Sequence, residues 1–120
     1  MPRPLVADWI RYHAENRKSD DPLFAACEEV DEFVSSQPET GWELILELIA
    51  AAPDDFILAN VAAGPLEDLL TKWPDQFVDR AEVQARRDLK FRRCLTGVWG
   101  LSAAVRARLV KFTSTIKDPL

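Results

Sequence analysis

Apolar side chains recur at intervals of three and four residues along most of the chain, which is the spacing of one face of an α-helix. The clearest stripes are Trp42, Ile45, Leu46 and Ile49, and Leu23, Cys27, Val30 and Val34. No alternating strand pattern of useful length is present, and the β-branched stretch 111–116 would have no sheet to join. The pattern therefore predicts an all-α protein.

Proline residues mark the expected helix starts, because proline is favoured in the first turn. The predicted helices cover approximately residues 4–16, 22–37, 38–52, 55–63, 65–73, 74–87, 88–100 and 102–112. Asp21, Ser102 and either Asp54 or Asp55 are predicted caps, and Gly64 is expected to end the fourth helix. We expect a compact bundle of six to eight short helices in consecutive antiparallel hairpins, one domain over 1–120, and a frayed tail at 113–120.

The composition is that of a soluble globular protein, with 48% hydrophobic and 29% charged residues. The N-terminus lacks the apolar segment of a signal peptide, and the longest apolar run, Leu48 to Pro53, is too short to span a bilayer. Cys27 and Cys94 are expected to be buried thiols in a reducing compartment. We therefore expect a cytoplasmic protein.

Charge is distributed very unevenly along the chain. Residues 1–70 contain 4 Lys and Arg against 15 Asp and Glu, whereas residues 71–120 contain 11 against 5. No basic residue lies between Lys18 and Lys72. An acidic surface of this kind attracts basic partners and repels anions, so we expect no membrane binding and no general nucleic-acid binding.

Candidate catalytic and metal sites are weak at the level of sequence. His13 is the only histidine, and any nucleophilic site would have to use it, with Cys27 as one conceivable partner. Glu28, Glu29, Asp31 and Glu32 lack the Glu-x-x-His motifs of di-metal bundles. The basic residues between Arg86 and Lys111 lack a glycine-rich phosphate loop and are expected to complement the acidic half. We assign no catalytic residue, no metal and no cofactor.

A resemblance rests on Ala-Ala-Gly-Pro-Leu-Glu-Asp-Leu-Leu at residues 62–70, Gly-Trp-Glu-Leu-Ile at 41–45 and Phe-Arg-Arg-Cys-Leu-Thr-Gly-Val-Trp at 91–99. Over about residues 38–100 the chain resembles a family of small, uncharacterised bacterial helical domains. The resemblance implies an α-helical bundle and no activity. Within the motif, Gly64 is expected to allow close backbone approach, Pro65 to start a helix, and Glu67 and Asp68 to lie in that helix's first turn or to pair with Arg86, Arg92 or Arg93.

These features favour a protein-binding module without catalytic activity, for example an acidic immunity-type protein that neutralises a basic partner. The residues predicted to bind the partner are Glu28, Asp31, Glu32, Glu39, Glu43, Glu47 and the tryptophan we expect to be exposed, Trp73. The alternatives are a self-associating scaffold, in which acidic and basic halves complement each other, and a small enzyme that uses His13 and carboxylates in a cleft.

Overall fold

The computed structural model describes residues 3–120, and within that range it contains helices and no strand. The elements are α1 (Pro4–Ala14), α2 (Phe24–Ser36), α3 (Pro38–Ala51), α4 (Asp55–Val61), the π-helical turn η1 (Ala62–Leu66), α5 (Glu67–Lys72), α6 (Pro74–Arg87), α7 (Leu89–Leu95) and α8 (Ala103–Thr113). The all-α prediction is confirmed.

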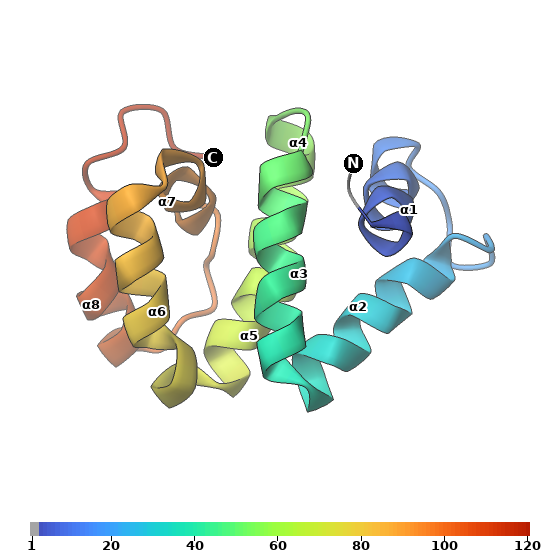
Figure 1. The fold of residues 1–120 in the computed structure, drawn as a ribbon. Helices are drawn as coiled ribbons and strands as arrows, with labels where there is room; N and C mark the ends of the chain where they lie inside the picture. Colours follow the sequence, from blue (N-terminus) through green and yellow to red (C-terminus); the bar gives the residue numbers. More distant parts are fainter. Residues whose placement is uncertain (1–2) are drawn as a thin grey trace.

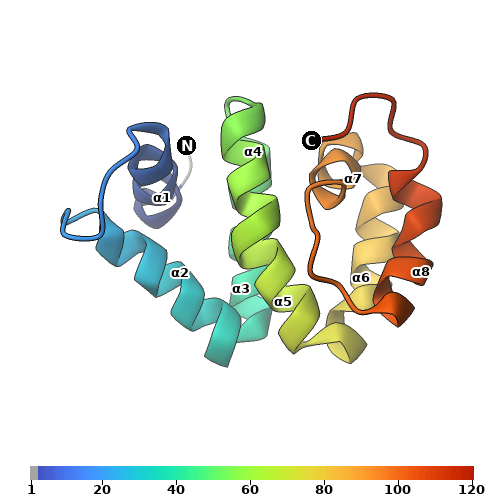
Figure 2. The same ribbon diagram turned by 180° about the vertical axis from the view of Figure 1, so that it is seen from behind.

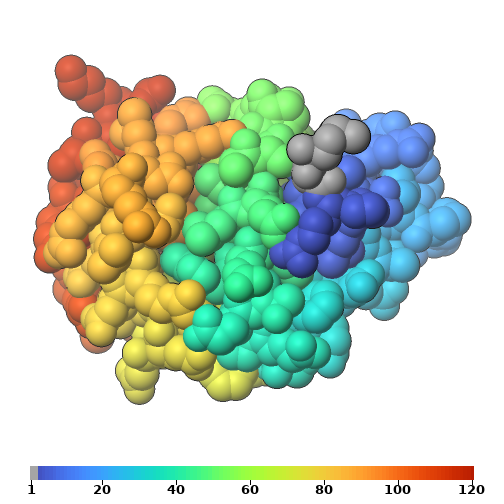
Figure 3. All heavy atoms as spheres, viewed as in Figure 1, coloured from blue at the N-terminus to red at the C-terminus, as the bar shows by residue number. Residues whose placement is uncertain are grey.

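The helices form three groups side by side (Figure 1). α3 and the α4–α5 segment stand in the centre, with α1 and α2 on one flank and α6, α7 and α8 on the other. α2 runs obliquely to α3. Seen from behind, α4, η1 and α5 are one continuous rod (Figure 2). The space-filling view shows α3 exposed on the front face between the two flanks (Figure 3).

Aromatic packing joins the centre to the second flank. The ring of Trp42 on α3 stacks on Phe77 of α6 and meets the edge of Phe91 on α7, both with ring centroids 5.6 Å apart. All three side chains are buried, and the core of the described residues contains no buried polar or charged residue. Burial of apolar surface is the dominant favourable contribution to folding, and these three rings add to the largely aliphatic core.

Two predicted caps hold in the structure, and one predicted start does not. Asp54 accepts a hydrogen bond from the backbone N–H of Ile57 at 3.0 Å, and Ser102 accepts one from Val105 at 3.3 Å. Asp21 accepts from the N–H of Leu23 at 2.8 Å, but this closes a turn, and α2 begins only at Phe24. The predicted start at Pro22 was therefore two residues early.

The C-terminal tail, which we expected to fray, folds back against α7. The backbone N–H of Leu120 donates to the hydroxyl of Thr96 at 2.9 Å, and Arg93 Nε donates to the carbonyl of Asp118 at 2.8 Å. Leu120 also packs against the core. The tail therefore has specific contacts at Asp118 and Leu120, and its fraying stays a prediction.

Several basic side chains of the C-terminal third cap helix ends. Lys90 donates to the carbonyls of Ala50 and Ala52 at the end of α3, at 3.2 and 2.8 Å. Arg92 does the same for Ala85 in the last turn of α6, at 2.9 Å. Cations are favourable at helix C-termini, where carbonyl groups lack partners within the helix. These residues therefore serve the fold rather than an anion site.

Candidate functional site

The carboxylates of α2 stay exposed and have no cationic partner within the described residues 3–120. Glu28, Glu29, Asp31 and Glu32 are all solvent-exposed, and none forms an ion pair with a lysine or arginine in residues 3–120. Glu32 Oε1 accepts a hydrogen bond from the hydroxyl of Ser36 at 3.0 Å, which is a neutral partner. Negative potential therefore remains on this flank.

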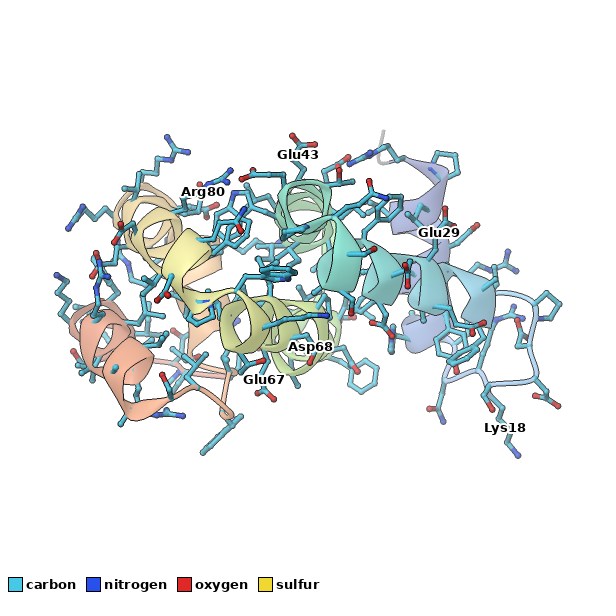
Figure 4. The ribbon with its side chains drawn as sticks, turned by 90° about the horizontal axis from the view of Figure 1, so that it is seen from below. Lys18, Glu29, Glu43, Glu67, Asp68 and Arg80 are labelled. Atoms are coloured by element: carbon cyan, nitrogen blue, oxygen red, sulfur yellow. The ribbon has the colours of Figure 1, made fainter. Side chains whose placement is uncertain are left out.

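The carboxylate row on α3 is largely neutralised. Arg80 of α6 binds both carboxylate oxygens of Glu39 at 2.7 and 2.5 Å, and Arg3 pairs with Glu47. Only the middle member, Glu43, has no ion pair among the described residues, and it lies on the same side of the molecule as Arg80 (Figure 4). The uncancelled acidic surface therefore lies along α2 and does not continue along α3.

The exposed tryptophan is Trp99, not Trp73. Trp73 is partly buried against the core, and its indole N–H donates to the carbonyl of Val34 at 2.9 Å. Trp99, in the connection between α7 and α8, is 75% exposed. The predicted helix over residues 88–100 included Trp99, whereas α7 ends at Leu95, so Trp99 lies outside the helix.

The Gly-Pro pair of the motif lies inside the α4–α5 rod, as part of the π turn. Proline in a helix interior removes one hydrogen bond and its ring clashes with the carbonyl four residues earlier. The wider π turn accommodates Pro65, and the backbone N–H of Glu67 donates to the carbonyl of Ala62. Gly64 therefore does not end a helix, and a Cβ built on it would meet no atom within 4 Å, so it is not a point of close backbone approach either.

The two carboxylates of the motif have different surroundings. Glu67 accepts hydrogen bonds from the backbone N–H groups of Trp99 and Gly100, both at 3.0 Å, and so fixes the α7–α8 connection. Asp68 is exposed and forms no ion pair among residues 3–120. Both carboxylates lie in the first turn of α5, as predicted, although this turn continues the π turn and is not a free helix start. Neither carboxylate pairs with Arg86, Arg92 or Arg93, so that alternative interpretation was wrong.

A hollow of about 390 Å³ lies between α1, α2 and η1, beside the unpaired α2 carboxylates. Its wall includes aromatic rings, polar groups and the Gly-Pro turn: Trp9, Tyr12, His13, Phe24, Cys27, Asp31, Asn60, Ala63, Gly64 and Pro65. The rings pack on one another, with centroids 4.1 Å apart for Trp9 and His13 and 5.6 Å apart for Tyr12 and Phe24. The fold therefore brings the Gly64–Pro65 motif, His13 and the predicted acidic residue Asp31 together around one hollow.

Within this hollow, His13 and Cys27 are in contact. The Sγ atom of Cys27 lies 3.6 Å from Nε2 of His13, within hydrogen-bonding distance for sulfur. Burial raises the pKa of the Cys27 thiol to about 11, and the negative charges of Asp31 and Glu28 act in the same direction. Burial also lowers the pKa of His13. Both groups are therefore neutral near pH 7, and the thiolate that a cysteine nucleophile needs is not favoured.

The charge of Asp68 acts on Asp31 across the surface. Partial burial is the main cause that raises the pKa of the Asp31 carboxyl, and the negative charges of Asp68 and Glu28 raise it further. Partial burial, followed by the charge of Glu67, raises the pKa of Asp68. Figure 4 shows Asp68 on the opposite side of the molecule from Glu43. Asp31 and Asp68 thus extend the acidic surface of α2 toward the central rod, on the side of the molecule opposite Glu43.

The enzyme alternative placed His13 and carboxylates in a cleft, but the sequence did not indicate which helices and which other residues form this hollow. Tyr12, Phe24 and Asn60 were not singled out, although Tyr12 and Phe24 flank the predicted apolar stripes. The position of these two aromatic residues at the edges of apolar stripes was visible in the sequence. The meeting of α1, α2 and η1 depends on tertiary packing, which the sequence pattern does not specify.

Comparison with protein-family models places residues 13–115 in DUF6869, a family of unknown function. The chain belongs to this family, and the match extends well beyond the 38–100 span of the resemblance noted above. The family defines a domain without an assigned activity. No curated protein and no solved structure matches the chain.

Two further observations concern membranes and metal ions. No helix within residues 3–120 has the combined length and apolar character needed to cross a membrane. No group of three or more histidine, cysteine or acidic residues in that range is arranged to hold a metal ion.

Proposed function

We propose that this protein is a protein-binding module that captures a basic partner on the α2 acidic surface, defined as Glu28, Asp31, Glu32 and Asp68. The observation that supports it most is the contrast between two sets of carboxylates. The fold supplies arginines to Glu39, Glu47 and Asp55, but no lysine or arginine of residues 3–120 pairs with the α2 acidic surface.

An unpaired carboxylate surface attracts cationic partners at long range and speeds their association. An immunity-type role in a bacterium, in which the domain neutralises a basic toxin, fits this electrostatic arrangement. The two free, buried cysteines support a reducing compartment, and we propose the cytoplasm.

Capture from a lysate of the source cells, followed by mass spectrometry, tests the proposal. The double variant Glu28→Lys/Glu32→Lys reverses two exposed charges that do not line the hollow. Its matched control, Asp75→Lys/Glu43→Lys, makes the same change of net charge at exposed residues elsewhere. We expect the first variant to lose a basic partner that the wild type and the control retain. Equal capture by all three proteins would contradict the proposal.

The same variants also test the alternative role, which is self-association. If the α2 acidic surface instead binds the basic residues of a second copy, light scattering should show wild-type dimers or larger species that the Glu28→Lys/Glu32→Lys variant lacks. The control variant should keep the wild-type distribution.

A cysteine hydrolase is the one enzyme class that a specific distance favours, because Cys27 and His13 lie 3.6 Å apart. The charge state of the pair argues against this class. A thiol with a pKa of about 11 and a histidine whose pKa is lowered by burial provide neither the thiolate nor the imidazolium of an activated pair.

A further inference from the structure

The hollow between α1, α2 and η1 combines π faces with a carboxylate and no cation. Tyr12, Phe24 and Trp9 contribute aromatic surface, and Asp31 stands at its edge. None of the residues that line it is a lysine or an arginine. With Cys27 and His13 neutral near pH 7, Asp31 is the one charged group of the lining. The hollow therefore has the electrostatic character of a site for a cation.

The chemistry of the wall favours an organic cation over a metal ion. Metal ions of the magnesium and calcium type need several oxygen ligands, whereas aromatic faces attract ammonium and guanidinium groups with partly apolar surfaces. The side-chain amide of Asn60 donates to the carbonyl of Phe56 at 2.8 Å, so Asn60 can offer its oxygen to an N–H donor. A hollow of about 390 Å³ is large enough for an alkylammonium group with its carbon chain.

From this geometry we infer that the hollow binds an alkylammonium cation, with the ammonium group at Asp31 and the carbon chain against Tyr12, Phe24 and the Gly64–Pro65 turn. The source of the cation is either a free amine or a lysine side chain of the partner. The second source rests on the proposed function and would place one anchoring lysine of the basic partner in the hollow, next to the α2 acidic surface.

Gly64 provides a variant that fills the hollow without strain. A Cβ at this position meets no atom within 4 Å, and Gly64 lines the hollow. Gly64→Leu should therefore place its side chain in the hollow while the rod keeps its helical backbone. Ala107→Leu, at an exposed position of α8, adds the same side chain at a distant surface and is the matched control.

The test is a titration followed by two-dimensional NMR near pH 7, with n-butylammonium, the neutral isostere 1-butanol, and a lysine side chain in an acetylated, amidated tripeptide. We expect saturable shifts at Tyr12, Cys27, Asp31 and Gly64 with butylammonium and with the peptide, and at least about tenfold weaker binding of the alcohol. Gly64→Leu should weaken binding at least about tenfold, Asp31→Asn about fivefold, and Ala107→Leu not at all.

Equal binding of the alcohol, shifts located elsewhere, or unchanged binding to Gly64→Leu would each overturn the inference. Peptide binding at least about tenfold tighter than that of the free amine would assign the source to a partner's lysine, and equal binding would assign it to a free amine. Failure of this titration leaves capture through Glu28 and Glu32 intact, because those residues lie outside the hollow, so the two proposals can fail separately.

Discussion

Carboxylates in this protein fall into two groups that differ in what the fold places beside them. Glu39 and Asp55 receive arginines from other helices, and Glu67 receives two backbone N–H groups. Asp31 and Asp68 receive neither, and each lies where partial burial and a neighbouring negative charge disfavour ionisation. Ionisation of these two carboxyls therefore carries a cost to folding.

Replacing Asp31 with asparagine should stabilise the protein near neutral pH. Because the folded-state pKa of Asp31 is raised above its ordinary value of 3.8, the wild type loses stability as pH rises from that value through the raised pKa. The Asp31→Asn variant lacks this loss. Urea denaturation should show a gain of up to about 0.5 kcal/mol at neutral pH and none below the ordinary pKa.

The control for this substitution is Asp75→Asn, in the first turn of α6. That change removes a carboxylate from a helix N-terminus and should lower stability slightly at neutral pH. A stability loss in Asp31→Asn at neutral pH would show that Asp31 already has a stabilising cationic partner.

Cys27 should react slowly with iodoacetamide near pH 7. Its rate should rise with a midpoint near pH 11, because only the thiolate is nucleophilic and the thiol pKa is about 11. Mass spectrometry of the peptides separates Cys27 from Cys94, whose deeper burial raises its thiol pKa to about 12. Rapid modification of Cys27 at pH 7 would instead support an activated cysteine and the hydrolase alternative.

At the scale of helices, two glycines have opposite roles. Gly41 lies at the crossing of α3 and α2, where there is no space for a side chain, because a Cβ there would lie 2.9 Å from the backbone Cα of Val34. Gly64, in the π turn, faces open space. The sequence motif drew attention to Gly64, whereas the close approach of two helices occurs at Gly41.

Alanine substitutions should separate these roles. Gly41→Ala should destabilise the protein by about 1–3 kcal/mol, because it forces α2 and α3 apart. Gly64→Ala should leave stability unchanged or raise it by up to about 1 kcal/mol, because alanine favours helix and meets no neighbour. Denaturation of both variants in urea measures the difference, and similar losses at both positions would contradict the packing described for α2 and α3.

Helix number and most helix starts could be predicted, because proline and capping side chains act locally. The sequence could not show that Gly64 and Pro65 continue a helix. Their local preference is for a break, and the packing of the central rod against both flanks overrides it. Asp88 caps α7 by accepting from Phe91 N–H at 3.0 Å, yet only a break was predicted there.

Candidate residues were predicted less completely than helices. Glu28, Asp31 and Glu32 could be selected from the absence of nearby basic residues in the sequence, and they remain unpaired. The pairing of Glu39 with Arg80 and of Glu47 with Arg3 spans 41 and 44 residues, so it depends on the fold. The exposure of Trp99 follows from the end of α7 at Leu95, well before the predicted end at residue 100. This difference is larger than the roughly one or two residues by which helix boundaries usually vary.

For the whole molecule, the uneven charge of the sequence survives folding only in part. The C-terminal third neutralises Glu39 and Asp55 and uses Lys90 and Arg92 to cap helix ends. Arg108 and Lys111 pair mainly with Glu82 of the neighbouring α6. The first flank therefore keeps a net negative surface along α2, with the aromatic hollow beside it.

The most direct test of this account is an NMR titration of the full chain with a lysine-rich peptide at low and at physiological salt. The account predicts shifts confined to α2, Asp68 and the hollow, affinity that falls steeply as salt is added, and loss of these shifts in Glu28→Lys/Glu32→Lys but not in Asp75→Lys/Glu43→Lys. Shifts spread along α3 around Glu43, or binding that the α2 variant leaves unchanged, would contradict it.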